Sequence, residues 1–535
     1  MRSPRPVRLR ETPAPVRARW AAGVAALAGF AGAGAFPQLG IWPLMVVSVA
    51  GLSWAVDGRR ARTGAWLGML YGLGFFVPLL HWTGVYVGAV PWLILAVAEA
   101  VFMAGLGAVL TLVQRLPLMP LWVGCAWVLE EALRDRLPFG GFPWGRLAFS
   151  QTGSPLRWLV ELGGAPLLTF AVAITGAALA SGALAIRSFR GPLPVRALVR
   201  AATVAVLVPL LGYLWGVTAV DPSSSHTLRV ALIQGSVPPR GLQFETRARQ
   251  VLHNHIAETM VLAREIHAGT VAQPDLVVWP ENASDVDPLT DKSAGAAISR
   301  AVRAVGAPTL VGAILHAPDN KRRNAGILWS PTTGPGQIYV KRHPVPFAEY
   351  IPLRGIAEAI SSAAKLVTQD MVAGTGNGLL TGGPVPIGEL ICFEVAYDDL
   401  VQSSVAAGAQ LVVVQTNNAT FGYTSETFQQ LAISKLRAIE TGRTVLQVST
   451  TGASAIISPE GTTIAEADKL YRPAILRADI ALETGETPAV WLGAAPEWFL
   501  TGIAVLAAAA SILLARRAKA PPAASAAVPD EMVGT

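Results

Sequence analysis

The feature that most constrains this chain is a series of apolar stretches that are long enough to cross a membrane as helices. Spanning a hydrocarbon layer about 30 Å thick takes about 20 mainly apolar residues, because a helix must satisfy its own backbone polar groups. We expect about eight such spans, near residues 20–36, 39–56, 64–80, 90–113, 119–133, 164–186, 201–220 and 498–515. A charged fraction of only 14%, against about 25% in ordinary soluble domains, also favours an α-helical transmembrane bundle.

Clusters of arginine between these stretches predict how the spans are oriented. Short cytoplasmic loops retain Lys and Arg, and basic residues precede the first stretch and follow the second, fourth, sixth and eighth. Both termini are therefore predicted to be cytoplasmic, with the long segment between the seventh and eighth spans outside. Because these clusters explain the net charge of +7 as a topology signal, no nucleic-acid partner is expected. The alternative of a cleavable signal peptide over residues 1–36 leaves the other spans oriented the same way.

Three glutamates fall within or at the ends of predicted spans, where an ionised carboxylate usually has a partner or a water-lined cavity. For Glu99, Glu130 and Glu131 we expect a helix end at the interface or a structural hydrogen bond. Trp144 lies in the aromatic loop FGGFPWGRLAFSQ, at the outer end of a predicted span. This loop fits an aromatic belt at the membrane interface and, equally well, a place that contacts substrate.

From about residue 221 to residue 496 the composition changes to that of an α/β domain. Strand-like runs at 228–235, 275–281, 307–315, 336–343, 386–394, 409–418, 444–452 and 454–461 alternate with helical patterns at 244–267, 294–305 and 426–441. Such alternation indicates a layered fold with a substantial core. The sequence thus predicts a membrane domain of seven spans over 1–220, an outer domain over 221–496, and a last span with a disordered cytoplasmic tail over 497–535.

Three reactive side chains each follow a predicted strand. Glu281 ends DLVVWPE, Lys341 follows GQIYV, and Cys392 follows PIGELI. A thiol needs a base and a nearby positive charge to become a nucleophile. We therefore predict that Cys392 attacks, that Glu281 takes its proton, and that Lys341 stabilises the oxyanion. Together these residues are the parts of an acyl-transfer site.

Two further glutamates are candidates for supporting roles. We expect Glu349 to fix the ammonium group of Lys341, and Glu394 to shape the pocket or hydrogen-bond backbone beside the nucleophile. The two cysteines, Cys125 and Cys392, are far apart in the sequence, so neither a disulfide framework nor a zinc cluster is encoded. No metal and no organic cofactor is expected.

In the order Glu281, Lys341, Cys392, these residues resemble the Glu-Lys-Cys triad of the nitrilase superfamily. The chain is most similar to one branch of it, the apolipoprotein N-acyltransferase family, through the motifs GFPWGRLAFSQ, ALIQGSVP, WPEN, KRHPVPFAEYIP, CFE, TNNATFG and RAIETGR. The resemblance covers almost the whole chain, with the motifs in the family's order. It implies an extracytoplasmic, nitrilase-like αββα sandwich that sits on the helical bundle.

The resemblance also implies a two-step reaction in the bacterial inner membrane, the last step of lipoprotein maturation. Cys392 would accept an acyl chain from a membrane phospholipid as a thioester. It would then pass the chain, in a ping-pong scheme, to the α-amino group of a diacylglyceryl-modified N-terminal cysteine on an apolipoprotein. By this resemblance Glu281, Lys341 and Cys392 carry over as base, oxyanion stabiliser and nucleophile, with Glu349 and Glu394 in support.

Three places depart from the family's pattern. Phe393 stands where a tyrosine often follows the nucleophile, the loop that begins at Asn417 lacks the usual tryptophan, and the nearest aromatic residue after ALIQG is Phe244. Phe244, Phe393 and Asn417 are still candidates, with Trp144, for contact with substrate.

Two other function classes fit parts of the sequence. A membrane-tethered amidase or nitrilase-type hydrolase would use the same three residues on a small soluble amide, although a tether needs only one span. A transporter or lipid-binding scaffold would account for the intramembrane glutamates. It would leave the three strand-end residues unexplained.

Overall fold

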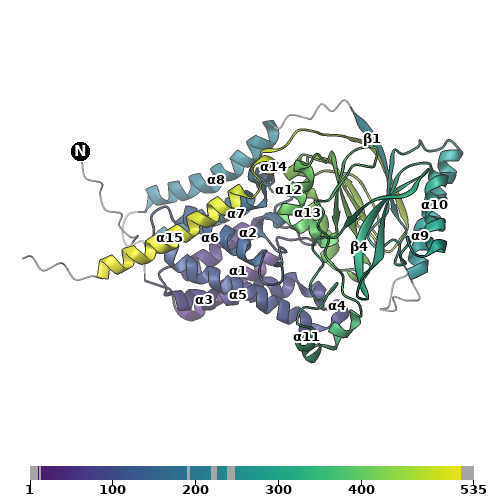
Figure 1. Ribbon diagram of the computed structural model, residues 1–535. Coiled ribbons are helices and arrows are strands. Elements are labelled where there is room, and N and C mark those ends of the chain that lie inside the picture. The colour runs from purple at the N-terminus through teal and green to yellow at the C-terminus, as the bar shows by residue number, and fades with distance from the viewer. Residues whose placement is uncertain (1–9, 11–13, 189–192, 219–225, 238–247, 520–535) are drawn as a thin grey trace, which may run out of the picture.

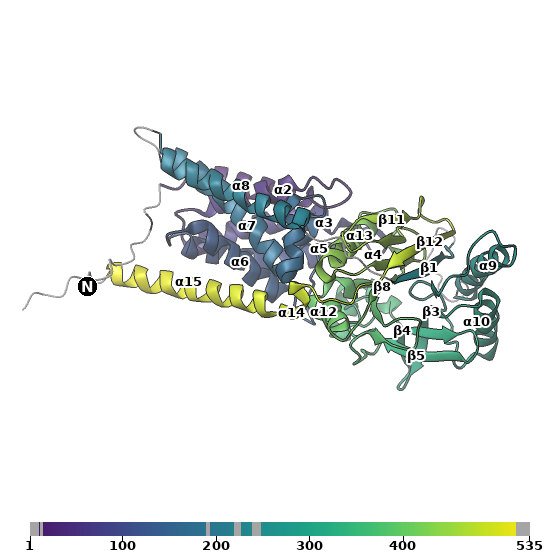
Figure 2. The ribbon, with the colours of Figure 1, turned by 90° about the horizontal axis from the view of Figure 1, so that it is seen from above.

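The computed structural model describes residue 10 and residues 14–188, 193–218, 226–237 and 248–519. Figure 1 shows two parts that lie end to end: a bundle of helices and, beyond one end of it, β-sheets flanked by helices. The view from above in Figure 2 shows the same arrangement. The two parts correspond to the apolar and the α/β regions of the sequence.

The bundle combines helices from the N-terminal region with one from the C-terminal region. It contains α1 (Ala18–Ala33), α2 (Pro43–Val56), α3 (Ala61–Leu79), α4 (Gly84–Val87), α5 (Ala89–Val113), α6 (Met119–Arg134), α7 (Val160–Arg187), α8 (Val195–Thr218) and α15 (Ala495–Lys519). Each predicted span coincides with one of these helices. Val220, at the predicted end of the seventh span, lies outside the described residues.

Several of these helices are long and apolar enough to cross a membrane. In the described part of the chain, four meet that test: α5, α7 with the turn before it, α8 and α15. A fifth candidate, α3 continued to Val87, is bent by 57° at a break. α1, α2 and α6 have only 16, 14 and 16 residues, which is short of a full crossing at about 1.5 Å per residue. The count of eight spans therefore stays a prediction.

Glycines allow α3 and α5 to pack closely. Gly64, Gly68 and Gly72 recur every four residues on α3, and a Cβ atom at Gly68 would lie 2.1 Å from the carbonyl oxygen of Met103 on α5. From the other helix, a Cβ atom at Gly107 would lie 2.2 Å from the carbonyl oxygen of Gly64. Small residues at this spacing let two backbones approach, which favours helix association in lipid.

Replacing Gly68 with leucine should destabilise the bundle, because the new side chain meets backbone that cannot move aside. Overpacking of this kind costs about 1–3 kcal/mol, so the unfolding temperature in detergent, followed by tryptophan fluorescence, should fall by several degrees. Gly105→Leu is the matched control, since a Cβ atom at Gly105 of α5 has nothing within 4 Å. Equal unfolding temperatures for the two variants would contradict this packing.

The outer part contains two six-stranded sheets. In spatial order, the first is β12 (Ala474–Ala481), β1 (Thr227–Gln234), β2 (Leu276–Val278), β3 (Thr309–Ala317), β4 (Lys321–Ser330) and β5 (Gly334–Val340). The second is β11 (Thr463–Glu466), β10 (Ala455–Ile457), β9 (Val445–Ser449), β8 (Leu411–Thr416), β7 (Ile387–Ile391) and β6 (Leu379–Leu380). The central strands β1, β2 and β3 are parallel, as are β7, β8 and β9. Their carboxyl ends therefore lie at one edge of each sheet.

Helices cover the outer face of each sheet. α9 (Ala248–His267) and α10 (Lys292–Val305) share an apolar core with the first sheet. α12 (Asp398–Ala406) and α13 (Glu426–Thr441) share one with the second, and a third apolar layer lies between the sheets. The result is a helix–sheet–sheet–helix sandwich, with α9 and α10 at the end away from the bundle (Figure 2).

The layer formed by α12 and α13 also joins the sandwich to the bundle. One continuous apolar core contains side chains of α3, α6 and α7 together with Val401 of α12 and Leu436 of α13. Figure 1 shows these two helices between the bundle and the sheets. The second sheet is therefore held on the end of the bundle through its own helical layer.

The eight predicted strands are all present as β1, β2, β3, β5, β7, β8, β9 and β10. The helix predicted over 426–441 is α13; Arg437 and Glu440 pair within it, and Gly442 ends it with a φ of +62°. β4, β6, β11 and β12 were not predicted. β4 begins with three exposed charged residues, KRR, before its buried run, so its sequence lacks a clear strand pattern at the start.

Candidate active site

The ends of β2 and β5 in the first sheet, with the loop after β5, bring together a lysine and two glutamates. Lys341 directly follows β5, and Glu281 lies three residues after β2. The Lys341 Nζ atom is 3.5 Å from Glu281 Oε1 and 2.9 Å from Glu349 Oε2. Lys341 and Glu281 are only 1% and 4% exposed. Charges that are buried so deeply depend on their partners, since each alone would be costly to desolvate.

Cys392 comes from the second sheet and directly follows β7. It has a φ of +57° and begins a 3₁₀ turn (Cys392–Ala396). Its sulfur is 3.6 Å from the Thr416 hydroxyl and 3.9 Å from the Gln430 amide nitrogen. A left-handed conformation costs an L residue about 1–2 kcal/mol, so the surrounding structure must impose it. The charges of Glu281 and Lys341 both act on this thiol.

Glu394 connects the end of β7 with the end of β5. Its buried carboxylate accepts hydrogen bonds from the backbone amide of Ile391 at 2.8 Å and from that of Arg342 at 2.6 Å. Ile391 precedes Cys392, and Arg342 follows Lys341. This carboxylate therefore fixes the backbone that carries the thiol relative to the backbone that carries the ammonium group.

Asn324, on β4, is a site residue that the sequence analysis missed. Its Nδ2 donates to Glu281 Oε1 at 2.6 Å and to Glu349 Oε1 at 2.9 Å. One side-chain amide thus holds both carboxylates that flank Lys341. The only sequence signal was an asparagine before an apolar run in RRNAGILWS, which is weak without knowledge of β4.

The electrostatics of the cluster favour a neutral thiol beside an ionised carboxylate. Burial raises the pKa of Glu281 and that of Cys392. Burial alone would lower the pKa of Lys341, but the carboxylates of Glu349 and Glu281 reverse the shift and keep its ammonium charged. Glu281 also accepts hydrogen bonds from Asn324 and from the Asn417 amide, as an ionised carboxylate does. A base with a raised pKa is suited to take a proton from the thiol and to return it.

Family models match both parts of the chain: the apolipoprotein N-acyltransferase N-terminal domain over residues 28–178 and the carbon-nitrogen hydrolase over residues 229–487. An apolipoprotein N-acyltransferase of Mycolicibacterium smegmatis is 41% identical over 496 residues, which cover 88% of this chain and 82% of that relative. The chain belongs to the apolipoprotein N-acyltransferase family. It is an acyltransferase with an apolar helical region and a nitrilase-like α/β domain, so the predicted family membership is confirmed.

Two other proteins are similar to this chain at lower sequence identity. An apolipoprotein N-acyltransferase of Azotobacter vinelandii is 29% identical over 90% of this chain and 93% of its own. Among solved structures, a mutant of an amidase of the nitrilase superfamily from Nesterenkonia aligns over 51% of this chain and 95% of its own, at 19% identity and a TM-score of 0.36.

In this acyltransferase Trp144 is buried beneath the outer domain and is only 2% exposed. Its ring stacks on that of Phe393, with 5.3 Å between the centroids and 8° between the planes, and its indole donates to Gln429 Oε1 at 2.7 Å. Phe142 also stacks on Phe393, at 5.4 Å. The alternative of an exposed aromatic belt is therefore wrong for Trp144, because the sandwich covers this end of the bundle.

Of the remaining candidates for substrate contact, the structure describes Asn417 but not Phe244. Asn417 reaches Glu281 with its backbone amide at 2.7 Å, while its side-chain oxygen accepts from the Thr450 hydroxyl at 2.8 Å. Phe244 lies outside the described residues. That Phe244, Phe393, Asn417 and Trp144 touch substrate stays a prediction.

Replacing Asn324 with alanine should move the acid side of the pH–rate profile to higher pH. The hydrogen bond from Asn324 lowers the pKa of Glu281, so its loss raises that pKa further and leaves the base protonated over a wider range. Glu281→Gln, which removes the predicted base, should cost about 100-fold or more in rate at every pH.

The measurement is the rate of acyl transfer as a function of pH in the purified protein. Asn377→Ala is the control, because Asn377 is an exposed asparagine outside this cluster. An acid limb that stays in place in Asn324→Ala would show that Asn324 does not tune the base.

Proposed function

We propose that this acyltransferase N-acylates the diacylglyceryl-modified N-terminal cysteine of apolipoproteins. The acyl donor is a membrane phospholipid, and the chain is carried as a thioester on Cys392. This reaction would be the last step of bacterial lipoprotein maturation. The observation that carries the proposal is the cluster of the buried Glu281 and Lys341 with the partly buried Cys392, in a domain that shares an apolar core with the helical bundle. Lipid substrates stay in the bilayer, because each buried CH₂ contributes about 0.8 kcal/mol.

In the first step Glu281 takes the proton of the Cys392 thiol while Sγ attacks the ester carbonyl carbon of the phospholipid. The Lys341 ammonium and neighbouring backbone amides stabilise the oxyanion. The ester carbon–oxygen bond then breaks, and Glu281 gives its proton to the leaving alkoxide. Lysophospholipid departs, and the acyl chain stays on Sγ. The raised pKa of Glu281 supports its use as both base and acid.

In the second step the neutral α-amino group of the lipoprotein cysteine attacks the thioester carbonyl carbon. Glu281 takes a proton from the amine, the carbon–sulfur bond breaks, and the proton passes to the Cys392 thiolate. The site returns to its starting state with an amide as product. Burial of Glu281 and Lys341 supports transfer over hydrolysis, since an enclosed site limits the access of water to the thioester.

An apolar cleft between the bundle and the outer domain supports a lipid donor. It has a volume of about 950 Å³ and lies between bundle helices and the outer-domain loop around Tyr423; its apolar lining includes Phe30, Leu73, Val77, Trp82, Val85 and Trp92. The Trp82 indole donates to Gln429 Oε1 at 3.2 Å. The next residue, Gln430, has its amide nitrogen 3.9 Å from the Cys392 sulfur. Adjacent residues of α13 therefore contact the lining of the cleft and the thiol.

We also propose a topology: about eight spans in the bacterial inner membrane, both termini cytoplasmic, and the α/β domain of residues 221–496 on the extracytoplasmic side. Residues 1–220 would form the first seven spans and residues 497–535 the last span and tail. Arginines at the ends of different helices support a common cytoplasmic face. Arg187 pairs with Asp57 at 3.3 Å, and Arg115 donates to the carbonyl oxygen of Arg59 at 3.3 Å.

Incubation with phospholipid that carries a labelled acyl chain should leave the label on Cys392. Hydroxylamine should remove it, because it cleaves thioesters, and a diacylglyceryl peptide with a free α-amino group should accept it. Mass spectrometry of the Cys392 peptide from the full chain measures both. Cys392→Ala should abolish labelling.

Cys125→Ala is the matched control, since Cys125 is the other cysteine, buried in α6, and its loss should leave labelling unchanged. Absence of label from Cys392, or turnover of a small soluble amide without acyl transfer, would contradict the proposed function. The second result would instead identify a hydrolase.

Val77→Trp should make the enzyme prefer shorter acyl chains, because the new ring fills part of the cleft. Exclusion of two CH₂ groups, at about 0.8 kcal/mol each, lowers the relative kcat/KM for long over short chains by about tenfold. Val97→Trp is the control, because Val97 is 43% exposed on α5 and is not part of the cleft lining. If both variants show the same chain-length selectivity, the cleft does not bind the acyl chain of the donor.

A further inference from the structure

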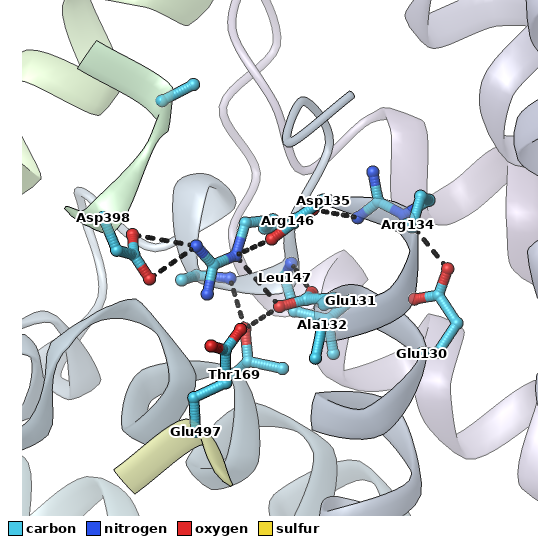
Figure 3. A network of polar contacts seen from close by, with 12 residues as sticks. Glu130, Glu131, Ala132, Arg134, Asp135, Arg146, Leu147, Thr169, Asp398 and Glu497 are labelled. Atoms are coloured by element: carbon cyan, nitrogen blue, oxygen red, sulfur yellow. Dashed lines mark hydrogen bonds and ion pairs between the residues drawn. The ribbon is translucent and has the colours of Figure 1, made fainter. Parts of the chain in front are cut away.

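Three buried arginines connect the bundle with the turn that carries Cys392. The side chains of Arg134 and Arg437 are 0% exposed and that of Arg146 is 3% exposed. Figure 3 shows the part of this network around Arg146. A buried guanidinium is costly unless carboxylates and carbonyl oxygens surround it. The partners of each arginine therefore identify the segments that it holds in place.

The first link fixes the loop that follows α6. Arg134, the last residue of α6, donates through Nη1 to the carbonyl oxygens of Phe142 and Trp144 at 2.9 and 2.7 Å. Its Nε is 3.0 Å from Glu130 Oε1, and its Nη1 is 3.5 Å from Glu99 Oε2. Two of the intramembrane glutamates thus have the structural role expected for them, as partners of the arginine that holds this loop.

The second link is Arg146, which lies on the same loop. Its Nε is 3.2 Å from Glu131 Oε2 and 3.3 Å from Asp135 Oδ2, both on the bundle side. Its Nη1 is 2.9 Å from each carboxylate oxygen of Asp398, the first residue of α12. In Figure 3 the guanidinium lies between these carboxylates. Arg146 therefore ties α6 of the bundle directly to α12 of the outer domain.

The third link is Arg437, on α13. Its Nη2 is 2.7 Å from Asp398 Oδ1, and it donates to the carbonyl oxygens of Val395 and Ala396 at 2.8 and 2.9 Å. Both carbonyl groups belong to the turn that begins with Cys392. The chain of contacts thus runs without a break from α6 to the turn of the thiol.

Asp398 is the residue that the last two links share. Burial would raise its pKa, but Arg146 and Arg437 together hold the pKa of Asp398 at about 2. It therefore stays ionised and keeps both arginines in place. The stacking of Phe393 on Phe142 and Trp144 joins the same loop to the same turn by a second route.

We propose that the membrane bundle itself positions the nucleophile, and that Arg146 is the positioning residue that couples the two. The inference rests on the proposed function, because it takes Cys392 as the attacking group. The left-handed conformation of Cys392 must be imposed by its surroundings, and Arg146 and Arg437 supply a rigid connection on one side of the turn. Since a displacement of about 1 Å can cost about 100-fold in rate, the connection bears on catalysis as well as on folding.

The test is the single-turnover rate of Cys392 acylation by labelled phospholipid in the full chain, expressed per folded enzyme. In Arg146→Ala we expect the rate constant to fall by about 100-fold. The apparent KM for phospholipid should stay within about threefold, because the cleft is untouched and only the transition state loses stabilisation. Arg146→Lys keeps a charge that can pair with Asp398 and should recover much of the rate. Alkylation of Cys392 by iodoacetamide should slow in Arg146→Ala and recover in Arg146→Lys.

The matched control is Arg136→Ala. Arg136 also makes a two-pronged ion pair, with Glu497 of α15 at 3.0 and 2.5 Å, but that pair lies within the bundle. Its loss should leave the acylation rate within about twofold of the wild type. This comparison separates loss of an ion pair from loss of the connection to the turn.

Asp398→Asn is the second variant, in case Arg146→Ala does not fold, because it keeps the shape of the side chain. It should lower the acylation rate in the same direction. In the double variant the two losses in acylation rate should not add, because both changes break the same connection between the bundle and the turn of Cys392. Additive losses would mean that the two residues act separately and would overturn the coupling.

A wild-type acylation rate in folded Arg146→Ala, or a loss that appears only in KM, would also overturn the proposal, even if the unfolding temperature falls. The wild-type enzyme serves as the internal reference. If it forms no thioester, the proposed function fails, whereas normal labelling of the wild type with an unchanged Arg146→Ala rate rejects only the role of Arg146.

Discussion

The pairing of Lys341 with two carboxylates is the interaction on which the candidate site depends. A lysine that is 1% exposed keeps its charge only if Glu281 and Glu349 stay beside it, and Asn324 holds both of these carboxylates. All four groups come from the first sheet or the loop after it. The thiol comes from the second sheet. Stacking of the sheets is therefore a condition for the chemistry. The Glu394 carboxylate and the Asn417 amide are polar contacts that join the two sheets at this place.

A second constraint comes from the proposed lipid substrates, which would stay in the bilayer. The outer helical layer of a free-standing sandwich would face water. Here α12 and α13 are covered by the bundle and share one apolar core with it. The same interface contains the arginine chain through Arg146 and Asp398 and the stack of Trp144 on Phe393. The surface between the two domains therefore also supports the turn that begins with Cys392.

The sequence predicted a good part of this arrangement, and its failures have physical reasons. Helical spans and most strands follow from local periodicity, so their positions agree with the structure. The span count does not follow, because helices such as α2, with 14 residues, are apolar but short. β4 was missed because its charged start hides its buried run. Trp144 was assigned in part to an aromatic belt because aromatic composition is the same whether a ring faces lipid or protein.

What the sequence by itself determined is local: which segments are apolar, where strands end, and which reactive side chains follow those ends, as with Glu281, Lys341 and Cys392. What only the tertiary structure decided is which distant groups meet. Asn324 bridges two glutamates, and Arg146 pairs with Asp398, 252 positions away in the chain. Hydrogen bonds and ion pairs act over a few ångströms, so their partners depend on how the chain packs. Periodicity along the sequence does not reveal that packing.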